Sequence, residues 1–159
     1  MATPITPYTK YLGDREPLAT ISDSIERVRT LTRDWSAERF GRSHAPGKWS
    51  ARQVLTHLAQ TEIALGHRAR MAVSTPHYVA QSFDQDAWIA FDGGLGGREA
   101  TDAFLATASM NLAFFQGLSA AQRATAFSHP EYGDVTVDWI IHQMAGHHIN
   151  HLLQLEAIP

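Results

Sequence analysis

The stretch from residue 137 to residue 155, VDWIIHQMAGHHINHLLQL, decides the fold. Its apolar residues recur every three or four positions, which is the spacing of a helix that buries one face. On a helical wheel at about 100° per residue, His147 and His151 lie about 40° apart, in the middle of the apolar stripe. The pattern predicts a helix that begins after Thr136 as its N-cap, ends near Ala157, and carries two histidines on its buried face.

Two further histidines of this helix have other positions on the wheel. His148 falls about 100° from His147, at the edge of the apolar stripe, and His142 falls about 220° away, on the side expected to face solvent. The whole chain contains nine histidines, and four of them lie within residues 142–151. We therefore expect two of the four to be interior, one marginal and one exposed.

Three more segments have helical periodicity, over about residues 17–37, 51–72 and 98–116. Ser50 and Gln53 match a capping box at the start of the second segment, and Gly117 is a suitable C-terminal cap for the third. The first sixteen residues are polar and proline-containing, so we expect them to form an extended arm on the surface. Residues 74–97 form a long connection, in which a short helix over residues 84–91 is expected.

Four helices of roughly 18–22 residues predict an all-α four-helix bundle about 30 Å long. A connection of roughly twenty residues between the second and third helices is long enough to cross the bundle, so these two helices need not be antiparallel neighbours. With 159 residues, 44% of them hydrophobic, the chain is expected to form a single domain over residues 1–159.

The composition argues against several classes of protein. A formal net charge of -3 gives no basic surface for nucleic acid. No apolar run reaches the roughly 18 residues of a membrane span, and the first residues do not resemble a signal peptide, so a cytoplasmic protein is expected. Because the chain has no cysteine, a disulfide, a thiolate metal site and a cysteine nucleophile are excluded. Any metal would be held by imidazole, carboxylate or carbonyl groups.

The buried histidines are candidate metal ligands. His147 and His151 are four residues apart, so their Cβ atoms lie about 5–6 Å from each other and both rings can reach one ion. Two buried imidazoles without a shared partner would leave polar nitrogens unsatisfied, at about 1–3 kcal/mol each. His57 borders the core face of its own helix, beside Val54 and Leu58, and is the candidate third ligand. The alternative role for His57 is that of a core histidine whose ring donates a hydrogen bond to a carbonyl oxygen.

Three imidazoles without a thiolate are typical of catalytic metal sites, which keep one position for water or substrate. Such a site lowers the pKa of bound water, or stabilises a bound thiolate. Glu62, Asn150 and Gln154 are near the ligands in sequence and are candidates to orient the rings, although Glu62 falls about 140° from His57 on the wheel. Trp49, Trp88 and Trp139 are core or pocket aromatics, one of which is expected to line the metal cleft.

Four segments of the chain resemble the DinB/YfiT-like superfamily. Residues 46–62, PGKWSARQVLTHLAQTE, resemble its second-helix signature, and residues 146–154, GHHINHLLQ, resemble its fourth-helix signature. Residues 83–88 and 129–133 resemble connecting segments of the same group. The resemblance implies a four-helix bundle with crossed-over topology, a nickel or zinc site and a homodimer. It places the metal ligands on the same three histidines, His57, His147 and His151.

The resemblance leaves the reaction open. Gln60, His148 and Asn150 differ from the residues common in the family, although none of them is a ligand position. Relatives include candidate metal-dependent hydrolases and enzymes that use low-molecular-weight thiols, so a small-molecule substrate or a thiol co-substrate is expected. The first hypothesis is a metal-dependent hydrolase or thiol-dependent transferase. The alternative is a non-catalytic metal- or ligand-binding bundle in which the ion is structural, because the sequence identifies no general base.

Overall fold

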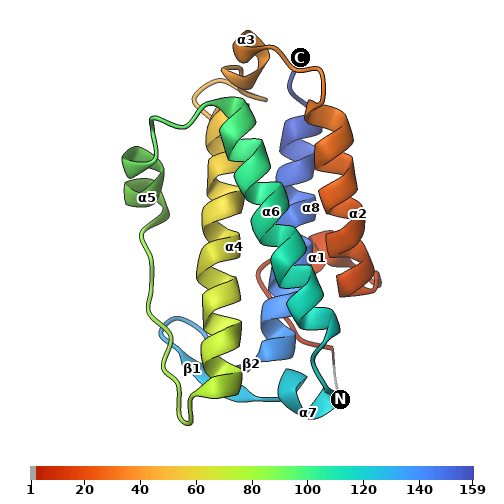
Figure 1. Cartoon of the computed structure of the whole chain (residues 1–159), viewed down its shortest axis with the longest axis vertical. Coiled ribbons are helices and arrows are strands. Elements are labelled where there is room, and N and C mark those ends of the chain that lie inside the picture. Colours follow the sequence, from red (N-terminus) through yellow and green to blue (C-terminus); the bar gives the residue numbers. More distant parts are fainter. Residues whose placement is uncertain (1–2) are drawn as a thin grey trace.

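Four long helices pack side by side in the computed structural model, which describes residues 3–159 (Figure 1). They are α2 (Pro17–Thr32), α4 (Ala51–Ser74), α6 (Gly97–Gln116) and α8 (Val137–Glu156). Helix α4 packs against α6 and α8, and α2 packs against the same two helices. The four helices therefore close a ring around one core, which confirms the expected four-helix bundle.

The bundle has a crossed-over topology. Helices α4 and α6 lie side by side and run in the same direction, whereas α8 runs opposite to α4 (Figure 1). The chain returns from the end of α4 to the start of α6 through residues 75–96, which pass along the outside of α4 and contain the short helix α5 (Gln85–Phe91). The long connection therefore makes α4 and α6 parallel neighbours, as its length allowed.

Local signals in the sequence fix where the long helices begin and end. The Ser50 hydroxyl accepts a hydrogen bond from the Gln53 backbone N–H at 3.3 Å, and the Gln53 side chain accepts one from the Ser50 N–H at 2.9 Å. At the start of α8, the Thr136 hydroxyl accepts from the Trp139 N–H at 3.1 Å. Helix α6 ends at the expected cap, Gly117. These contacts satisfy backbone groups that have no partner within the helix.

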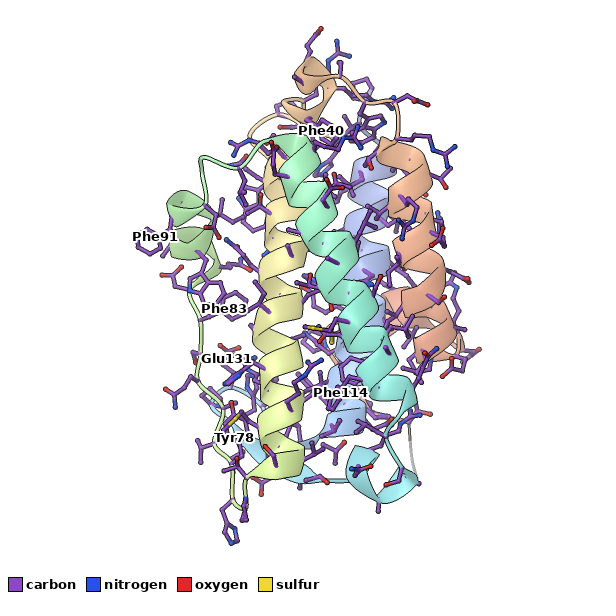
Figure 2. The ribbon with its side chains drawn as sticks, viewed as in Figure 1. Phe40, Tyr78, Phe83, Phe91, Phe114 and Glu131 are labelled. Atoms are coloured by element: carbon purple, nitrogen blue, oxygen red, sulfur yellow. The ribbon has the colours of Figure 1, made fainter. Side chains whose placement is uncertain are left out.

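The core is made by the apolar faces of the four helices. Ile21, Leu55, Phe104 and Ile140, one from each long helix, are fully buried. Phe91, in contrast, projects from α5 away from the bundle (Figure 2) and is 83% exposed. None of the helices formed by residues 3–159 combines the length and the hydropathy needed to cross a bilayer.

The first helix is shorter than its periodicity predicts. It ends at Thr32 instead of near residue 37, and a separate short helix, α3 (Ala37–Phe40), follows. The Ser36 hydroxyl accepts from the Arg39 N–H at 3.2 Å and so begins a new helix. The buried Trp35 ring lies 5.5 Å from Phe40, between centroids, so the chain turns here to close the end of the core.

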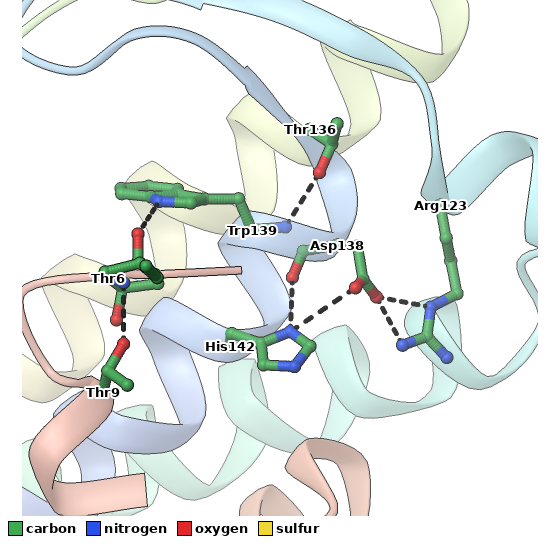
Figure 3. A network of polar contacts seen from close by, with 8 residues as sticks. Thr6, Thr9, Arg123, Thr136, Asp138, Trp139 and His142 are labelled. Atoms are coloured by element: carbon green, nitrogen blue, oxygen red, sulfur yellow. Dashed lines mark hydrogen bonds and ion pairs between the residues drawn. The ribbon is translucent and has the colours of Figure 1, made fainter. Parts of the chain in front are cut away.

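The N-terminal segment is not simply an extended arm. Residues 9–12 form a helical turn, α1 (Thr9–Leu12), that packs against α8, while residues 1 and 2 lie outside the described residues. The Thr9 hydroxyl accepts from the Thr6 N–H at 2.7 Å, and Trp139 Nε1 donates to the backbone of residue 5 at 3.0 Å (Figure 3). Gly146 permits the approach, because a Cβ there would lie 2.6 Å from the Tyr8 carbonyl oxygen. The expectation of an extended arm was wrong for residues 9–12.

A small sheet interrupts the otherwise helical fold between α6 and α8. After α7 (Ala120–Arg123), strands β1 (Ala126–His129) and β2 (Gly133–Thr136) form an antiparallel hairpin. The backbone of Ser128 also pairs with the long connection, accepting from the Ala80 N–H at 2.9 Å and donating to the Tyr78 carbonyl at 3.1 Å. The composition of this region had predicted a loop. The hairpin forms because Phe127 and His129 point into the protein on one face, while Gly133 turns the chain with a φ of 67°.

Candidate metal centre

Three histidine side chains meet between α4 and α8. One nitrogen of each of His57, His147 and His151 lies within 4.8 Å of the other two, and all three residues are buried. The His57 and His147 Nε2 atoms are 2.9 Å apart, and the ring centroids of His147 and His151 are 4.4 Å apart. The structure therefore brings together the three residues that the helical wheel and the family resemblance selected.

The antiparallel packing of α4 and α8 explains why the histidines lie at one level. His57 comes six residues after the start of α4 at Ala51, and His151 comes five residues before the end of α8 at Glu156. At a rise of about 1.5 Å per residue, these positions are about 9 Å and about 7.5 Å from the same end of the bundle. His147 is one helical turn from His151, so it faces the same point.

Burial keeps the three imidazoles neutral. Burial, together with a smaller effect of the neighbouring His151 ring, lowers the pKa of His57 to about 3. Burial also lowers the pKa of His151 to about 4, against the opposing effect of its hydrogen bond to Gln154, and it holds the pKa of His147 well below the usual range. Neutral imidazoles are the form that binds a metal ion.

The ring of His151 is oriented by a side chain that the sequence analysis had named. Its Nδ1 donates to Gln154 Oε1 at 2.8 Å, so Nε2 has a free lone pair. Metal-binding histidines usually have such a partner on the second nitrogen. Of the other two candidates, Asn150 is half-buried, and Glu62 contacts His148 instead of the three-histidine cluster.

The donor set fits a divalent metal ion. His57 and His147 have buried Nδ1 atoms without a hydrogen-bond partner among the described residues. If one Nε2 atom donates to the other, the Nδ1 lone pair of the donating ring has no partner, whereas an ion shared by the three rings would accept one lone pair from each. Three neutral nitrogens that share an ion suit zinc or nickel chemistry.

His148 is buried more deeply than the wheel predicted. It is 2% exposed, because α6 covers this face of α8 with the Phe104 ring at 5.2 Å. Its Nε2 lies 2.6 Å from Glu62 Oε1, and the second oxygen of Glu62 accepts from Asn111 Nδ2 at 2.7 Å. The expected edge position of His148 was wrong. The large wheel angle between Glu62 and His57 was the signal that Glu62 faces a different neighbour.

His142 is half-buried, not solvent-facing as expected. Its Nδ1 lies 2.9 Å from the Asp138 carbonyl oxygen and 3.5 Å from the Asp138 carboxylate (Figure 3). Arg123 from α7 binds the same carboxylate at 2.5 Å. These contacts hold α7 and the first turn of α8 together, and they give His142 a structural role outside the three-histidine cluster.

A cavity of about 320 Å³ reaches from the cluster along one face of α4. His57 and His147 lie in its wall with Tyr8 and Trp139, and the long connection and the hairpin contribute Phe83 and Glu131. Figure 2 shows Phe83 and Glu131 on the same side of α4. The cavity therefore gives a small molecule access to the histidines.

The far end of this cavity contains polar residues that the sequence analysis did not assign to the site, namely Arg68, His129 and Glu131. The resemblance of residues 129–133 to a connecting segment was the available signal for two of them.

A second cavity, of about 220 Å³, touches the cluster at His151 and is also lined by Lys48 and Trp49. Trp88 instead packs against Phe83, at 4.9 Å between centroids.

A comparison with known protein families identifies the family of this chain. The model of the DinB superfamily matches residues 20–155 of the chain. The chain belongs to the DinB superfamily. The match includes α4, all but the last residue of α8 and all three histidines of the cluster, and it confirms the resemblance seen in the sequence.

Curated relatives and solved structures agree with this assignment. Two proteins of Oceanobacillus iheyensis, each named "putative metal-dependent hydrolase", are 24% identical over 139 residues and 21% identical over 142 residues. The matches cover 87% and 89% of this chain and 81% and 82% of the relatives. YfiT from Bacillus subtilis, described as "a probable metal-dependent hydrolase with an unusual four-helix bundle topology", has a TM-score of 0.77 at 16% identity, covering 98% of this chain and 90% of YfiT. A mycothiol-dependent maleylpyruvate isomerase has a TM-score of 0.74 at 15% identity, covering 98% of this chain and 68% of the isomerase. These structures share the fold of this DinB-superfamily chain.

Proposed function

We propose that His57, His147 and His151 bind one divalent metal ion and that this chain is a metal-dependent hydrolase. The observation that carries the proposal is the convergence of three neutral, buried imidazoles at the wall of a cavity. The two Oceanobacillus relatives, which carry hydrolase names, support it. Zinc or nickel is the proposed metal, because imidazole nitrogens suit both ions.

An ion held by three neutral nitrogens keeps a position for water or substrate and lowers the pKa of bound water toward neutrality. The protein's own groups would position the substrate. Thr61 Oγ1 and Gln143 Oε1 are buried polar atoms of lining residues without a partner among the described residues, so they are free to bind substrate. The rings of Tyr8 and Trp49, each 5.0 Å from a histidine ring, would limit the access of bulk water.

Thiol-dependent transfer is the second candidate. Two cavities adjoin the cluster, one at His57 and His147 and the other at His151. Such a pair suits a reaction with two substrates, in which a low-molecular-weight thiol enters from one side and its acceptor from the other. The fold shared with the mycothiol-dependent isomerase is consistent with this candidate.

The variant His151→Ala tests metal binding first, and the same proteins are then assayed for activity. The control is His67→Ala, which removes an exposed histidine of α4 outside the cluster. We expect the wild type and the control to bind about one zinc or nickel ion per chain. His151→Ala should lose more than about 100-fold in affinity, since loss of a group that only orients a ligand already costs about 10–100-fold. Zinc at about 100 times its Kd should stabilise the wild type by about 2.7 kcal/mol.

Activity is then assayed on a panel of esters, amides and thiol conjugates, before and after chelation. Activity that is lost on chelation and restored by metal supports the enzyme. A protein that binds metal and gains stability, but shows no metal-dependent turnover on the panel, supports the alternative of a structural ion. A wild type that stays metal-free under zinc and nickel titration contradicts the site itself. Assembly as a homodimer, a cytoplasmic location and the lack of nucleic-acid binding stay predictions from the sequence.

A further inference from the structure

Arg68 is a buried cation in the wall of the large cavity. It extends from α4, is 7% exposed, and forms no ion pair among the described residues. Its Nη2 donates to the carbonyl oxygen of Gln81, and its guanidinium lies 5.8 Å from the centre of the Phe83 ring. The long connection therefore holds the guanidinium in place. A buried guanidinium with no carboxylate within ion-pair distance is unfavourable, and an anion bound beside it would supply the missing partner.

His129 places a second hydrogen-bond donor beside Arg68. The His129 Nδ1 accepts from the Glu131 backbone N–H at 3.1 Å, so the proton of the neutral ring is on Nε2. That Nε2 lies 3.2 Å from Arg68 Nη1, which is also a donor. Two N–H groups that face each other repel, and an oxygen atom that accepts from both removes the repulsion. The arrangement is therefore suited to an anionic oxygen in the cavity.

The cavity connects this donor pair to the histidine cluster. His57, Thr61, Leu65 and Arg68 recur at helical spacing on one face of α4, and all four line the cavity. His57 and Arg68 are eleven positions apart, which is about 16 Å along the helix at about 1.5 Å per residue. The Thr61 hydroxyl, buried and without a partner, lies between them. The two polar ends are thus joined by a wall that includes apolar side chains.

The charge at the far end limits the kind of anion. Glu131 is the carboxylate among the lining residues, and it interacts favourably with both Arg68 and His129. Arg68 can pair with one negative charge, and the nearby Glu131 carboxylate repels a dianion more strongly than a monoanion, so a monoanion is favoured over a phosphate or another dianion. Aromatic rings of the cavity wall, Phe83, Tyr132 and Trp139, favour an apolar body attached to that anion.

We propose that Arg68 and His129 bind the carboxylate of an elongated carboxylic acid, with its apolar body along Leu65 and the aromatic wall. This carboxylate clamp, formed by Arg68 and His129, would bind a carboxylate whether or not the histidine cluster is catalytic. The further assignment, that the other end of the same molecule is the reacting group at the histidine cluster, rests on the proposed function. The substrate class is therefore a monocarboxylate with its reactive group several carbon atoms from the acid.

The probe is 4-phenylbutyrate, compared with its uncharged amide, in calorimetric titrations. The metal-free protein is titrated first, because a bound ion can itself take up a carboxylate, and the zinc-loaded protein second. We expect the acid to bind at least about tenfold more tightly than the amide, since hydrogen bonds to charged groups are stronger than neutral ones. Arg68→Met should remove that preference and change amide binding less than about twofold.

Three further variants make the test specific. Arg70→Met is the control, because Arg70 lies on the same helix but donates to Gly66 and Asn111 instead of lining the cavity. It should keep the full preference for the acid. Glu131→Gln should tighten acid binding, because it removes the competing carboxylate and leaves the backbone N–H to His129 intact. If Arg68→Met does not fold, as judged by circular dichroism, His129→Gln is used and should weaken acid binding about threefold or more.

Equal binding of acid and amide by the wild type overturns the carboxylate clamp. The clamp is also overturned if Arg70→Met loses as much of the preference for the acid as Arg68→Met does. A zinc titration of the same protein distinguishes a failure of the carboxylate clamp from a failure of the proposed metal site. Zinc binding without a preference for the acid contradicts the clamp alone, whereas a preserved preference without zinc or nickel binding contradicts the metal site alone.

Discussion

Replacing Glu62 by Gln tests the buried contact between α4, α6 and α8. Both Glu62 oxygens accept hydrogen bonds, Oε1 from His148 Nε2 at 2.6 Å and Oε2 from Asn111 Nδ2 at 2.7 Å. Gln has the same shape but offers one oxygen and one NH2 group. It satisfies both partners when its oxygen faces Asn111 and His148 carries its proton on Nδ1, so that His148 Nε2 accepts from the NH2 group. Two hydrogen bonds to a carboxylate thereby become hydrogen bonds between neutral groups, at a loss of about 1 kcal/mol each. We expect Glu62→Gln to lower the free energy of unfolding by about 1–3 kcal/mol.

Urea unfolding followed by circular dichroism measures this loss, with and without zinc. For a chain of this size the same loss lowers Tm by about 2–12 °C, at about 2–4 °C per kcal/mol. The matched control is Glu156→Gln, which breaks an ion pair with Arg27 whose side chains are 36% and 54% exposed. The control should lose less than about 1 kcal/mol. A loss below about 0.5 kcal/mol in Glu62→Gln, or an equal loss in the control, would refute the reasoning.

Three other predictions follow from single contacts. Gln154→Leu removes the acceptor that orients His151, so zinc affinity should fall about 10–100-fold in a competition titration, and an unchanged affinity contradicts this role. The metal-free protein should lose stability as the pH falls from about 7 to 4, because burial lowers the pKa of His57 to about 3 and that of His151 to about 4, while the unfolded chain takes up protons near pH 6.5. Thermal melts across this range check the sign, and His57→Ala should flatten the dependence. Gly146→Ala should lower stability by about 1–3 kcal/mol, since its Cβ would lie 2.6 Å from the Tyr8 carbonyl oxygen, and an unchanged Tm would show that the N-terminal segment is not held there.

Helical periodicity and caps predicted the bundle well because they depend on neighbours in sequence. The start of α4 at Ser50 and of α8 at Thr136 needed no tertiary information, since each cap is a contact across three residues. The turn at residues 33–36 and the hairpin at residues 126–136 were missed. Their geometry depends on packing, because Trp35 closes one end of the core and the β1 strand pairs with residues 78–80.

The sequence by itself determined that His147 and His151 share the buried face of one helix, because helical geometry places residues four apart on the same side. The approach of His57, 90 residues from His147, required the antiparallel packing of α4 on α8. The contact of Arg68 with His129 and that of Glu62 with His148 span 61 and 86 residues. No local pattern encodes such pairs, since they form only when the crossover and the bundle core bring distant segments together. The tertiary structure alone therefore decided which polar side chains line the cavity and which are buried behind it.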